Sequence, residues 1–518
     1  MKILLFILFT LLSSLVFSQA GNRDSTYGIY GVGQNSFPMY GIRAIAIQSD
    51  GKAIAVGESW SSAFGIVRFK TNGSLDSSFG SNGMVDIAVG AGGGWATGVK
   101  IQPDGKIVVG GQVHDNNGKW CFGIIRLNAD GSLDNSFNGT GAAIVSAGNL
   151  YDYCMAIALQ PDGKIVAVAQ SRSSGPPIIQ FGVVRINSNG TIDNTFGTGG
   201  ALMTSIGNSI AAPSCVAVQP DGKILVGGSS GLGAGPPNSF ALIRYNNNGT
   251  LDTTFGTGGK DTTFFGGGGS TGSSSDDDEG YSLALQLDGK IIFAGTSNLG
   301  SDTVVPLTML RYNIDGSLDN SFGINGKVRQ IMPFGYSGYA RTLLLQPDNK
   351  IVLSGVCYSP SPLIGAYFVL SRYISTGSLD STFGINGIVV DSLDHSHDNE
   401  IWSSALSPEG KIIVGGNSGV GFTIARYLSG LNVGVPPIPQ QNNELLIYPN
   451  PADNNLHVHY LNAGEKPTAI NIFDITGKLV LTKPCTNFTG DMDIDVIELP
   501  QGMYFVKVGS AAKKFVKE

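Results

Sequence analysis

The stretch Gln160-Pro161-Asp162-Gly163-Lys164 decides the fold, because the chain repeats it with small changes over most of its length. An apolar run precedes each copy and another follows it, which predicts a tight hairpin turn between two β-strands. Proline presets φ at the start of such a turn, and glycine accepts the positive φ that the turn needs. The copies are at residues 48–52, 102–106, 160–164, 219–223, 286–290, 346–350 and 407–411.

These turns divide the chain into repeats of 54 to 67 residues. Each turn leads into a β-rich run, a variable loop and a strand that ends in arginine. The phrase Gly-Ser-Leu-Asp-x-x-Phe follows, as at residues 131–137, and then a fourth apolar run. Four short strands predict one antiparallel sheet per repeat. Seven such sheets arranged radially form a β-propeller, whereas a solenoid usually has shorter units and needs capping repeats.

The two ends of this region predict that the ring of sheets is closed. The last repeat stops after the strand that ends at Arg426, and the phrase missing there occurs at residues 24–31. The N-terminal segment should therefore supply the fourth strand of the last sheet and cover its open edge. We predict an all-β chain with a seven-bladed β-propeller over residues 19–430.

An arginine and an aspartate recur eight residues apart in each repeat, which predicts a charge-assisted hydrogen bond between the strand and the following turn. A pair that is present in every repeat indicates a structural role. The pairs are Arg68/Asp76, Arg126/Asp134, Arg185/Asp193, Arg244/Asp252, Arg311/Asp319 and Arg372/Asp380, and closure of the ring pairs Arg426 with Asp24.

Residues 1–18 are typical of a secretory signal peptide, with Lys2 ahead of a largely apolar stretch. A membrane anchor is the alternative, but the stretch is short for a span of roughly 20 residues. We expect no transmembrane span in the mature chain.

The net charge of −7 and the lack of a basic stripe argue against nucleic acid as a partner. The five irregularly placed cysteines predict buried apolar residues rather than a disulfide framework.

The composition changes after Arg426. Residues 431–443 form a proline-rich linker, and residues 444–518 contain short alternating strands that predict a small β-sandwich.

Both parts resemble known families. The phrases Leu-Gln-Pro-Asp-Gly-Lys-Ile (159–165) and Arg-Leu-Asn-x-x-Gly-Ser-Leu-Asp-x-x-Phe (126–137) are similar to the delta-sixty repeat of bacterial secreted proteins, over roughly residues 24–428. That resemblance implies a propeller and an extracellular setting, and it implies no catalytic chemistry.

The C-terminal segment resembles the sorting domain of the type IX secretion system, and an ordinary accessory sandwich is the alternative. The resemblance implies export by that machinery and later removal of the domain, so that the protein is secreted or attached to the outer cell surface. The matching residues are Tyr448, Pro449, Asn450, Pro451, Gly477, Lys478, Gly502, Tyr504 and the basic tail at 513–517.

A ligand site is expected where the repeats differ. The residue five positions before the glutamine of each turn, here called the channel position, varies freely and begins the strand that should line the central channel. It reads Arg43, Thr97, Met155, Ser214, Tyr281, Arg341 and Trp402. Arg43, Tyr281, Arg341 and Trp402 could hold an anionic or sugar ligand, and plain surface variation is the alternative.

Two segments are candidate metal sites, although no cofactor is otherwise expected. His395, His397 and Asp398 could suit a divalent metal. The acidic run at residues 276–279 could bind Ca²⁺, or it could be a solvated flexible loop.

Three functions fit these features. The first is a non-catalytic binding or adhesion propeller with a glycan or protein ligand. The second is an extracellular glycan-degrading hydrolase or lyase, which for hydrolysis needs two carboxylates about 5–10 Å apart; Asp394, Asp398 and Glu400 lie near the channel position Trp402. The third is a structural surface component.

Overall fold

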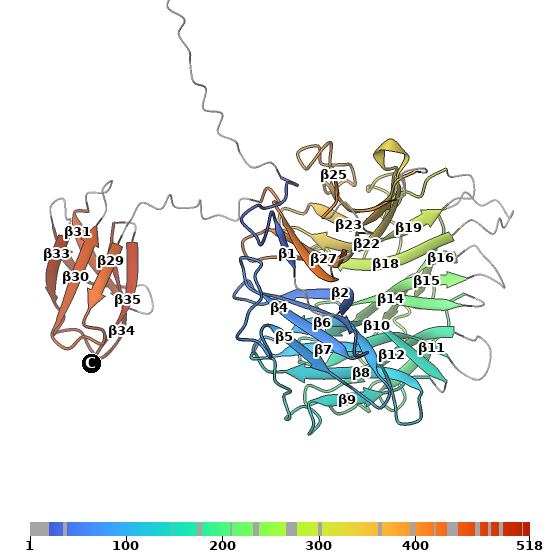
Figure 1. Cartoon of the computed structure of the whole chain (residues 1–518), viewed down its shortest axis with the longest axis horizontal. Coiled ribbons are helices and arrows are strands. Elements are labelled where there is room, and N and C mark those ends of the chain that lie inside the picture. The colour runs from blue at the N-terminus through green and yellow to red at the C-terminus, as the bar shows by residue number, and fades with distance from the viewer. Residues whose placement is uncertain are drawn as a thin grey trace, which may run out of the picture. The chain divides into compact units, whose positions relative to one another are not determined.

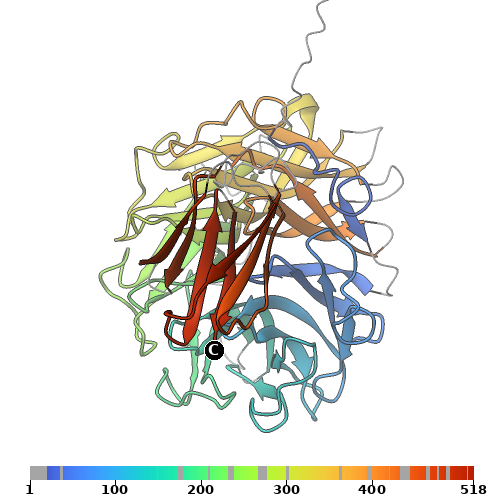
Figure 2. The same ribbon diagram turned by 90° about the vertical axis from the view of Figure 1, so that its left-hand side faces the viewer.

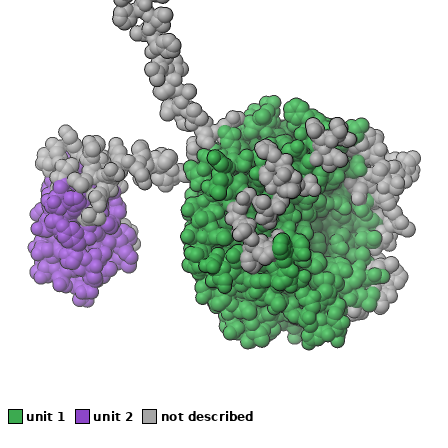
Figure 3. All heavy atoms as spheres, viewed as in Figure 1, with its two compact units in different colours: residues 1–431 green, residues 432–518 purple. Residues whose placement is uncertain are grey.

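The computed structural model describes residues 20–34, 39–148, 150–172, 179–207, 210–231, 238–265, 277–298, 303–360, 365–393, 399–418, 421–431, 444–461, 467–474, 478–485, 490–509 and 511–518. The chain divides into two compact units, residues 1–431 and 432–518 (Figure 3). The predicted signal peptide and linker residues 432–443 lie outside the described residues.

In the part of the chain that the structure describes, unit 1 consists of five four-stranded antiparallel sheets and one eight-stranded sheet (Figure 1). The first contains β2 (Met39–Ile47), β3 (Ala53–Ser59), β4 (Phe64–Phe69) and β5 (Met84–Ile87). The second contains β6 (Gly94–Ile101), β7 (Ile107–His114), β8 (Trp120–Leu127) and β9 (Ala142–Val145). The third contains β10 (Tyr151–Leu159), β11 (Ile165–Arg172), β12 (Ile179–Ile186) and β13 (Ala201–Thr204).

An eight-stranded sheet follows, in which one parallel bridge from Asn238 to Asp277 joins two groups of four strands. One group is β14 (Ala211–Val218), β15 (Ile224–Gly231), β16 (Asn238–Tyr245) and β17 (Lys260–Thr263). The other is β18 (Asp277–Leu285), β19 (Ile291–Asn298), β20 (Leu307–Tyr312) and β21 (Lys327–Gln330), followed by the short 3₁₀ helix η1 (Pro333–Gly335).

Two further sheets complete unit 1. One contains β22 (Ser337–Leu345), β23 (Ile351–Tyr358), β24 (Ala366–Tyr373) and β25 (Ile388–Asp391). The other contains β26 (Glu400–Leu406), β27 (Ile412–Ser418), β28 (Gly421–Tyr427) and the N-terminal β1 (Val32–Gln34).

The groups of four strands follow one another around a common centre. Their first strands are neighbours in the order β2, β6, β10, β14, β18, β22 and β26, and β26 returns to β2. In Figure 2 the colours run around unit 1 in chain order, so that the orange end returns to the blue start. The all-β prediction and the propeller arrangement are therefore confirmed. The count of seven blades stays our interpretation, because it divides the eight-stranded sheet into two.

The apolar core lies between neighbouring sheets. The second strand of each group is buried along nearly its whole length, as in β7, because sheets pack against both of its faces. Ile54 and Val56 of the first sheet pack in one cluster with Val99 and Val109 of the second. This packing explains why the second strands read as continuous apolar runs rather than alternating ones.

The N-terminal strand completes the last sheet. β1 pairs antiparallel with β28, with Val32 opposite Ala425 and Gln34 opposite Thr423. Asp24 lies 3.0 Å from the Nε of Arg426, across 402 residues of sequence. The two ends of the repeat region therefore meet as the sequence predicted.

Each repeat arginine binds three groups at once. Arg126 donates from Nε to Asp134 at 2.7 Å and lies over the Phe137 ring, 4.9 Å from its centroid. Its Nη1 donates to the carbonyl of Ser188 in the next sheet. The turn lysine Lys106 contacts the same aspartate at 2.7 Å. Both repeated phrases therefore meet at one buried carboxylate.

The same arrangement occurs in every repeat. The arginine-to-aspartate distances are 2.7–3.0 Å. Each arginine donates to a carbonyl oxygen just beyond the third strand of the following group, and Arg426 donates back to the first group. The acceptors for Arg68, Arg126, Arg185, Arg244, Arg311, Arg372 and Arg426 are Ala129, Ser188, Asn247, Ile314, Ser375, Ser429 and Thr71.

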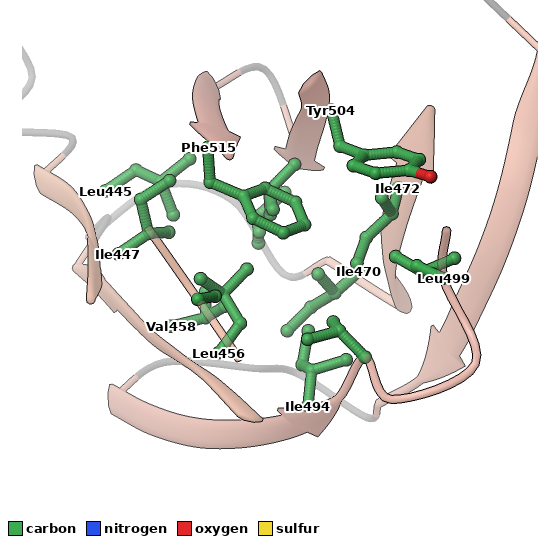
Figure 4. Packing of buried hydrophobic residues seen from close by; sticks show 14 of the residues in the cluster. Leu445, Ile447, Leu456, Val458, Ile470, Ile472, Ile494, Leu499, Tyr504 and Phe515 are labelled. Atoms are coloured by element: carbon green, nitrogen blue, oxygen red, sulfur yellow. The ribbon is translucent and has the colours of Figure 1, made fainter. Parts of the chain in front are cut away.

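Unit 2 is a sandwich of two sheets. One contains β29 (Glu444–Tyr448), β30 (Asn455–Leu461) and β33 (Gly490–Asp495). The other contains β31 (Ala469–Asp474), β32 (Leu479–Pro484), β34 (Gly502–Val508) and β35 (Ala511–Lys517). Apolar side chains of both sheets, among them Leu456, Ile470 and Phe515, pack in one cluster between them (Figure 4).

Among the described residues, no helix has the length and apolar character needed to cross a bilayer.

Replacing Asp24 with alanine should destabilise unit 1 about as much as replacing Asp134, by about 3 kcal/mol, because each change leaves a largely enclosed arginine without its carboxylate. Thermal and urea unfolding of the two variants would measure this. Asp104→Ala is the control, since among the described residues its side chain accepts only the hydrogen bond from the Lys106 amide within the turn. A clearly smaller loss at Asp24 would contradict closure by this contact.

Acid should also destabilise unit 1. Burial raises the pKa of Asp76 and Asp380, but hydrogen bonds from Ser78 and Thr382 and the arginine charges outweigh burial, so that each pKa falls to about 2. Because an unfolded aspartate titrates near pH 3.9, the stabilisation is complete above about pH 5 and is lost as the pH falls toward 2. Unfolding midpoints measured across this range should fall, and Asp380→Asn should make the fall shallower. An equal slope in that variant would assign the acid sensitivity to other groups.

Candidate ligand-binding site

The channel position is a β-bulge in every repeat. The register between the first and second strands skips the channel residue in every pair, and in the pair of β2 and β3 it also skips Tyr40. A bulge residue leaves the hydrogen-bonded ladder, so its side chain is re-aimed and is not required for pairing. The bulge thus explains why this position varies freely in sequence.

All seven channel residues line one cavity of about 790 Å³. They are Arg43, Thr97, Met155, Ser214, Tyr281, Arg341 and Trp402. The structure therefore brings together the four residues that the sequence singled out as a candidate ligand site.

Those four residues form a continuous stack, here called the cationic arc. The guanidinium of Arg341 lies 4.5 Å from the Tyr281 ring centroid and 4.8 Å from that of Trp402. Arg43 lies 4.5 Å from the Trp402 centroid. Cations and aromatic rings thus alternate across four neighbouring sheets, and cation–π attraction holds the arginines in place.

The two arginines of the arc have no ion-pair partner among the described residues. Glu58 and Glu400 act on Arg43 at longer range, and Glu400 accepts a 2.6 Å hydrogen bond from Tyr358. Arg43 reaches the solvent in the channel, yet the surrounding protein lowers its pKa, and these carboxylates only partly compensate. Guanidinium donors thus remain directed at the cavity without a carboxylate partner in the described part of the chain.

Aromatic side chains line the cavity at the two sheets that follow the arc; we call them the aromatic wall. Trp95 and Trp120 meet edge to face with centroids 5.0 Å apart, and Tyr153 lies 5.9 Å from Trp120. The side chain of His114 stacks on Trp120 at 3.6 Å. Trp95 and Tyr153 stand two residues before their channel residues, so comparing the repeats at that position as well would have found them.

The other predicted sites have different outcomes. His395, His397 and Asp398, like Asp394, lie outside the described residues. The prediction of a solvated loop for the acidic run was wrong, because residues 277–279 begin β18. Asp278 is fully buried and accepts a hydrogen bond from the Phe265 amide. Within the described ranges, no group of three histidine, cysteine, aspartate or glutamate side chains could hold a metal ion.

The residues that resemble a sorting motif hold turns and edges of unit 2. Asn450 accepts a hydrogen bond from the Val516 amide at 2.9 Å, and the Tyr504 hydroxyl donates to the Pro500 carbonyl at 2.8 Å. The amide of Lys478 donates to Asp474 at 3.0 Å. Tyr448 is the last residue of β29 and Pro449 follows it. Pro451 precedes the buried Ala452, and Gly502 begins β34. Gly477 lies outside the described residues.

Comparisons with known proteins identify both units. The model of a β-propeller domain of unknown function, DUF5122, matches residues 48–79, 102–137, 160–196, 219–255 and 286–322. The model of the secretion system C-terminal sorting domain matches residues 446–518. No curated protein matches the chain.

Among solved structures, the chain is similar to PorZ, a surface component of the type IX secretion system of Porphyromonas gingivalis, at 14% identity and a TM-score of 0.41. The match covers 91% of this chain and only 58% of PorZ. A family PL25 ulvan lyase matches at 13% identity and a TM-score of 0.42. That match covers 79% of this chain and 94% of the lyase. An α-L-arabinanase of Penicillium chrysogenum matches at 10% identity and a TM-score of 0.38. That match covers 64% of this chain and 91% of the arabinanase.

The two family matches and the strand topology lead to one conclusion. The chain carries DUF5122 β-propeller repeats followed by a type IX sorting domain, which indicates export to the cell surface or the extracellular space.

Proposed function

We propose that this protein is a non-catalytic binding propeller that captures an anionic extracellular ligand in its central channel. The sorting domain implies interaction with the type IX secretion machinery. Its removal after export and attachment of the propeller to the outer surface are part of the proposal. In this account the propeller is the working unit of the exported protein and serves in adhesion.

The cationic arc is the observation that carries this proposal. Arg43 and Arg341 are held by stacking on Trp402 and Tyr281 rather than by ion pairs with described carboxylates. A guanidinium held in this way keeps its N–H donors for a carboxylate, sulfate or phosphate. Preorganisation by rigid aromatic rings also lowers the entropic cost of binding.

The aromatic wall favours a ligand with sugar rings. Tryptophan and tyrosine present flat apolar surfaces that also carry a polar group, which suits a ring with apolar faces and hydroxyl edges. Gln112 and Gln170 line the same cavity and supply amide donors and acceptors. A glycan fits this lining better than a purely apolar ligand does.

A glycan-degrading hydrolase or lyase is the second candidate. Glu279 and Glu400 each stand two residues before a channel residue and each accept a tyrosine hydroxyl, from Tyr281 and Tyr358 respectively. Two glutamates, each two residues from a channel residue, are the residue type that glycoside hydrolysis uses.

Arg341→Ala and Trp402→Ala should each lower the affinity for an acidic glycan about 10-fold or more, because one removes the charged donor and the other removes the ring that holds it. A glycan array with the full chain, followed by calorimetry on the best ligand, would measure this. Tyr30→Ala, which removes an exposed ring outside the cavity lining, is the control for loss of the Trp402 ring.

The same panel tests catalysis when product formation is followed for each glycan. Binding without turnover, lost in the arc variants, supports the proposal. If a glycan is turned over and Glu400→Ala or Asp398→Ala abolishes the turnover, the protein is a glycan-degrading enzyme and the binding proposal is wrong. Full binding in every arc variant would contradict a site in the channel.

A further inference from the structure

One lysine interrupts a position that is otherwise small and apolar. The residue two positions before the glutamine or serine of each turn is alanine in five repeats and leucine in one, but Lys100 in the second repeat. The others are Ala46, Ala158, Ala217, Ala284, Leu344 and Ala405. No packing rule of the scaffold therefore demands a lysine there.

Lys100 lines the same cavity as the cationic arc. It lies on β6, three residues beyond the channel residue Thr97, which is about 10 Å along a strand. Its side chain is open to the channel rather than packed into the core. Trp95 stands on the same strand at the other side of Thr97, so the strand presents a ring, a hydroxyl and an ammonium group in succession.

No described side chain neutralises this lysine. It has neither a hydrogen bond nor an ion pair within the described part of the chain, whereas the turn lysines all contact an aspartate. Confinement among protein atoms lowers its pKa, and no carboxylate raises it again. The charged residues of the described lining are Arg43, Lys100 and Arg341, all of them cationic.

Resting on the proposed function, we propose that the ligand is an acidic oligosaccharide with at least two acidic groups, one held by Arg43 and Arg341 and another deeper in the channel by Lys100. The aromatic wall then stacks a sugar ring beside the arc. Alternating charge and ring along one chain is the chemistry of uronate-containing or sulfated polysaccharides. The ligand enters from the side of Trp95 and Trp120 and extends toward the turns.

Carbohydrate is favoured over the other extended polyanions. The net charge of −7 repels every long polyanion outside the few cations of the channel, so the other features of the cavity decide between them. Stacking platforms and amide side chains inside the cavity favour rings that carry hydroxyl groups. Both other polyanions are included as outcomes of the test.

The test uses the full chain and oligogalacturonates from monomer to hexamer, with alginate and chondroitin sulfate oligomers and neutral cello-oligosaccharides beside them. Affinity should rise with length for the acidic series and should weaken with salt. Lys100→Ala should lower the affinity for the longer acidic oligomers about 10-fold and leave the monomer unchanged, because the monomer reaches only the arc.

The controls are built into the repeat. Alanine is the natural residue at this position in five repeats, so Lys100→Ala should fold with an unchanged melting temperature. Lys100→Arg should keep most of the affinity. Lys70→Ala removes an exposed lysine outside the cavity lining and should change nothing.

The outcomes separate this proposal from the proposed function. If Arg341→Ala abolishes binding but Lys100→Ala leaves long and short oligomers equal to the unmodified protein, the arc stands and the second anchor is wrong. If no acidic saccharide binds, or if neither variant matters, both proposals fail. If only polyglutamate or an oligodeoxynucleotide binds in a Lys100-dependent manner, the assignment to carbohydrate is overturned.

Discussion

A buried aspartate shared by an arginine and a lysine is the interaction on which unit 1 depends. The arginine comes from the third strand of a sheet, and the lysine comes from the hairpin that joins the first two. The same arginine reaches a carbonyl oxygen of the next sheet and stacks on an aromatic ring of its own. Local turn geometry, strand order and contact between sheets are therefore fixed at one place. Removal of the aspartate leaves the arginine without its carboxylate, which is costly.

Because the aspartate cluster stabilises the repeats, the channel position is free to vary for ligand binding. The bulge takes one residue per repeat out of the hydrogen-bonded ladder, at the strand nearest the centre. Stability rests on the aspartate cluster and on packing between sheets, so the bulge residue carries little structural demand. Arg43, Tyr281, Arg341 and Trp402 could diverge there without cost to the scaffold. The repeat keeps the backbone constant and lets the lining of the channel change.

Much of the fold could be predicted from the sequence, because the same turn and strand motifs recur in each repeat. The closure of the ring followed from one missing phrase after Arg426 and its presence at Asp24, and the structure joins the two. The gathering of the channel residues into one cavity was also expected. The stacking of Arg341 between Tyr281 and Trp402 was not, because side-chain contacts across sheets depend on packing that no sequence spacing gives. Trp120 and Lys100 were missed since they lie outside the one position that was compared.

The burial of Asp278 could not be predicted from composition. Composition alone favoured a solvated loop for the acidic run, but β18 begins at residue 277, and Asp278 is fully buried and accepts a hydrogen bond from the Phe265 amide.

The pairing of β1 with β28 has a consequence for how the molecule is made. The contact between Asp24 and Arg426 spans 402 residues, so it carries a large loop-closure entropy and raises the contact order of the ring. The first and last strands can meet only after the last repeat has left the ribosome or the translocation pore. Until then the final sheet presents a free edge, and any chain that arrives truncated at either end keeps that edge open to other strands. The ring thus acts as a check on completeness, because only an intact chain hides its last adhesive edge.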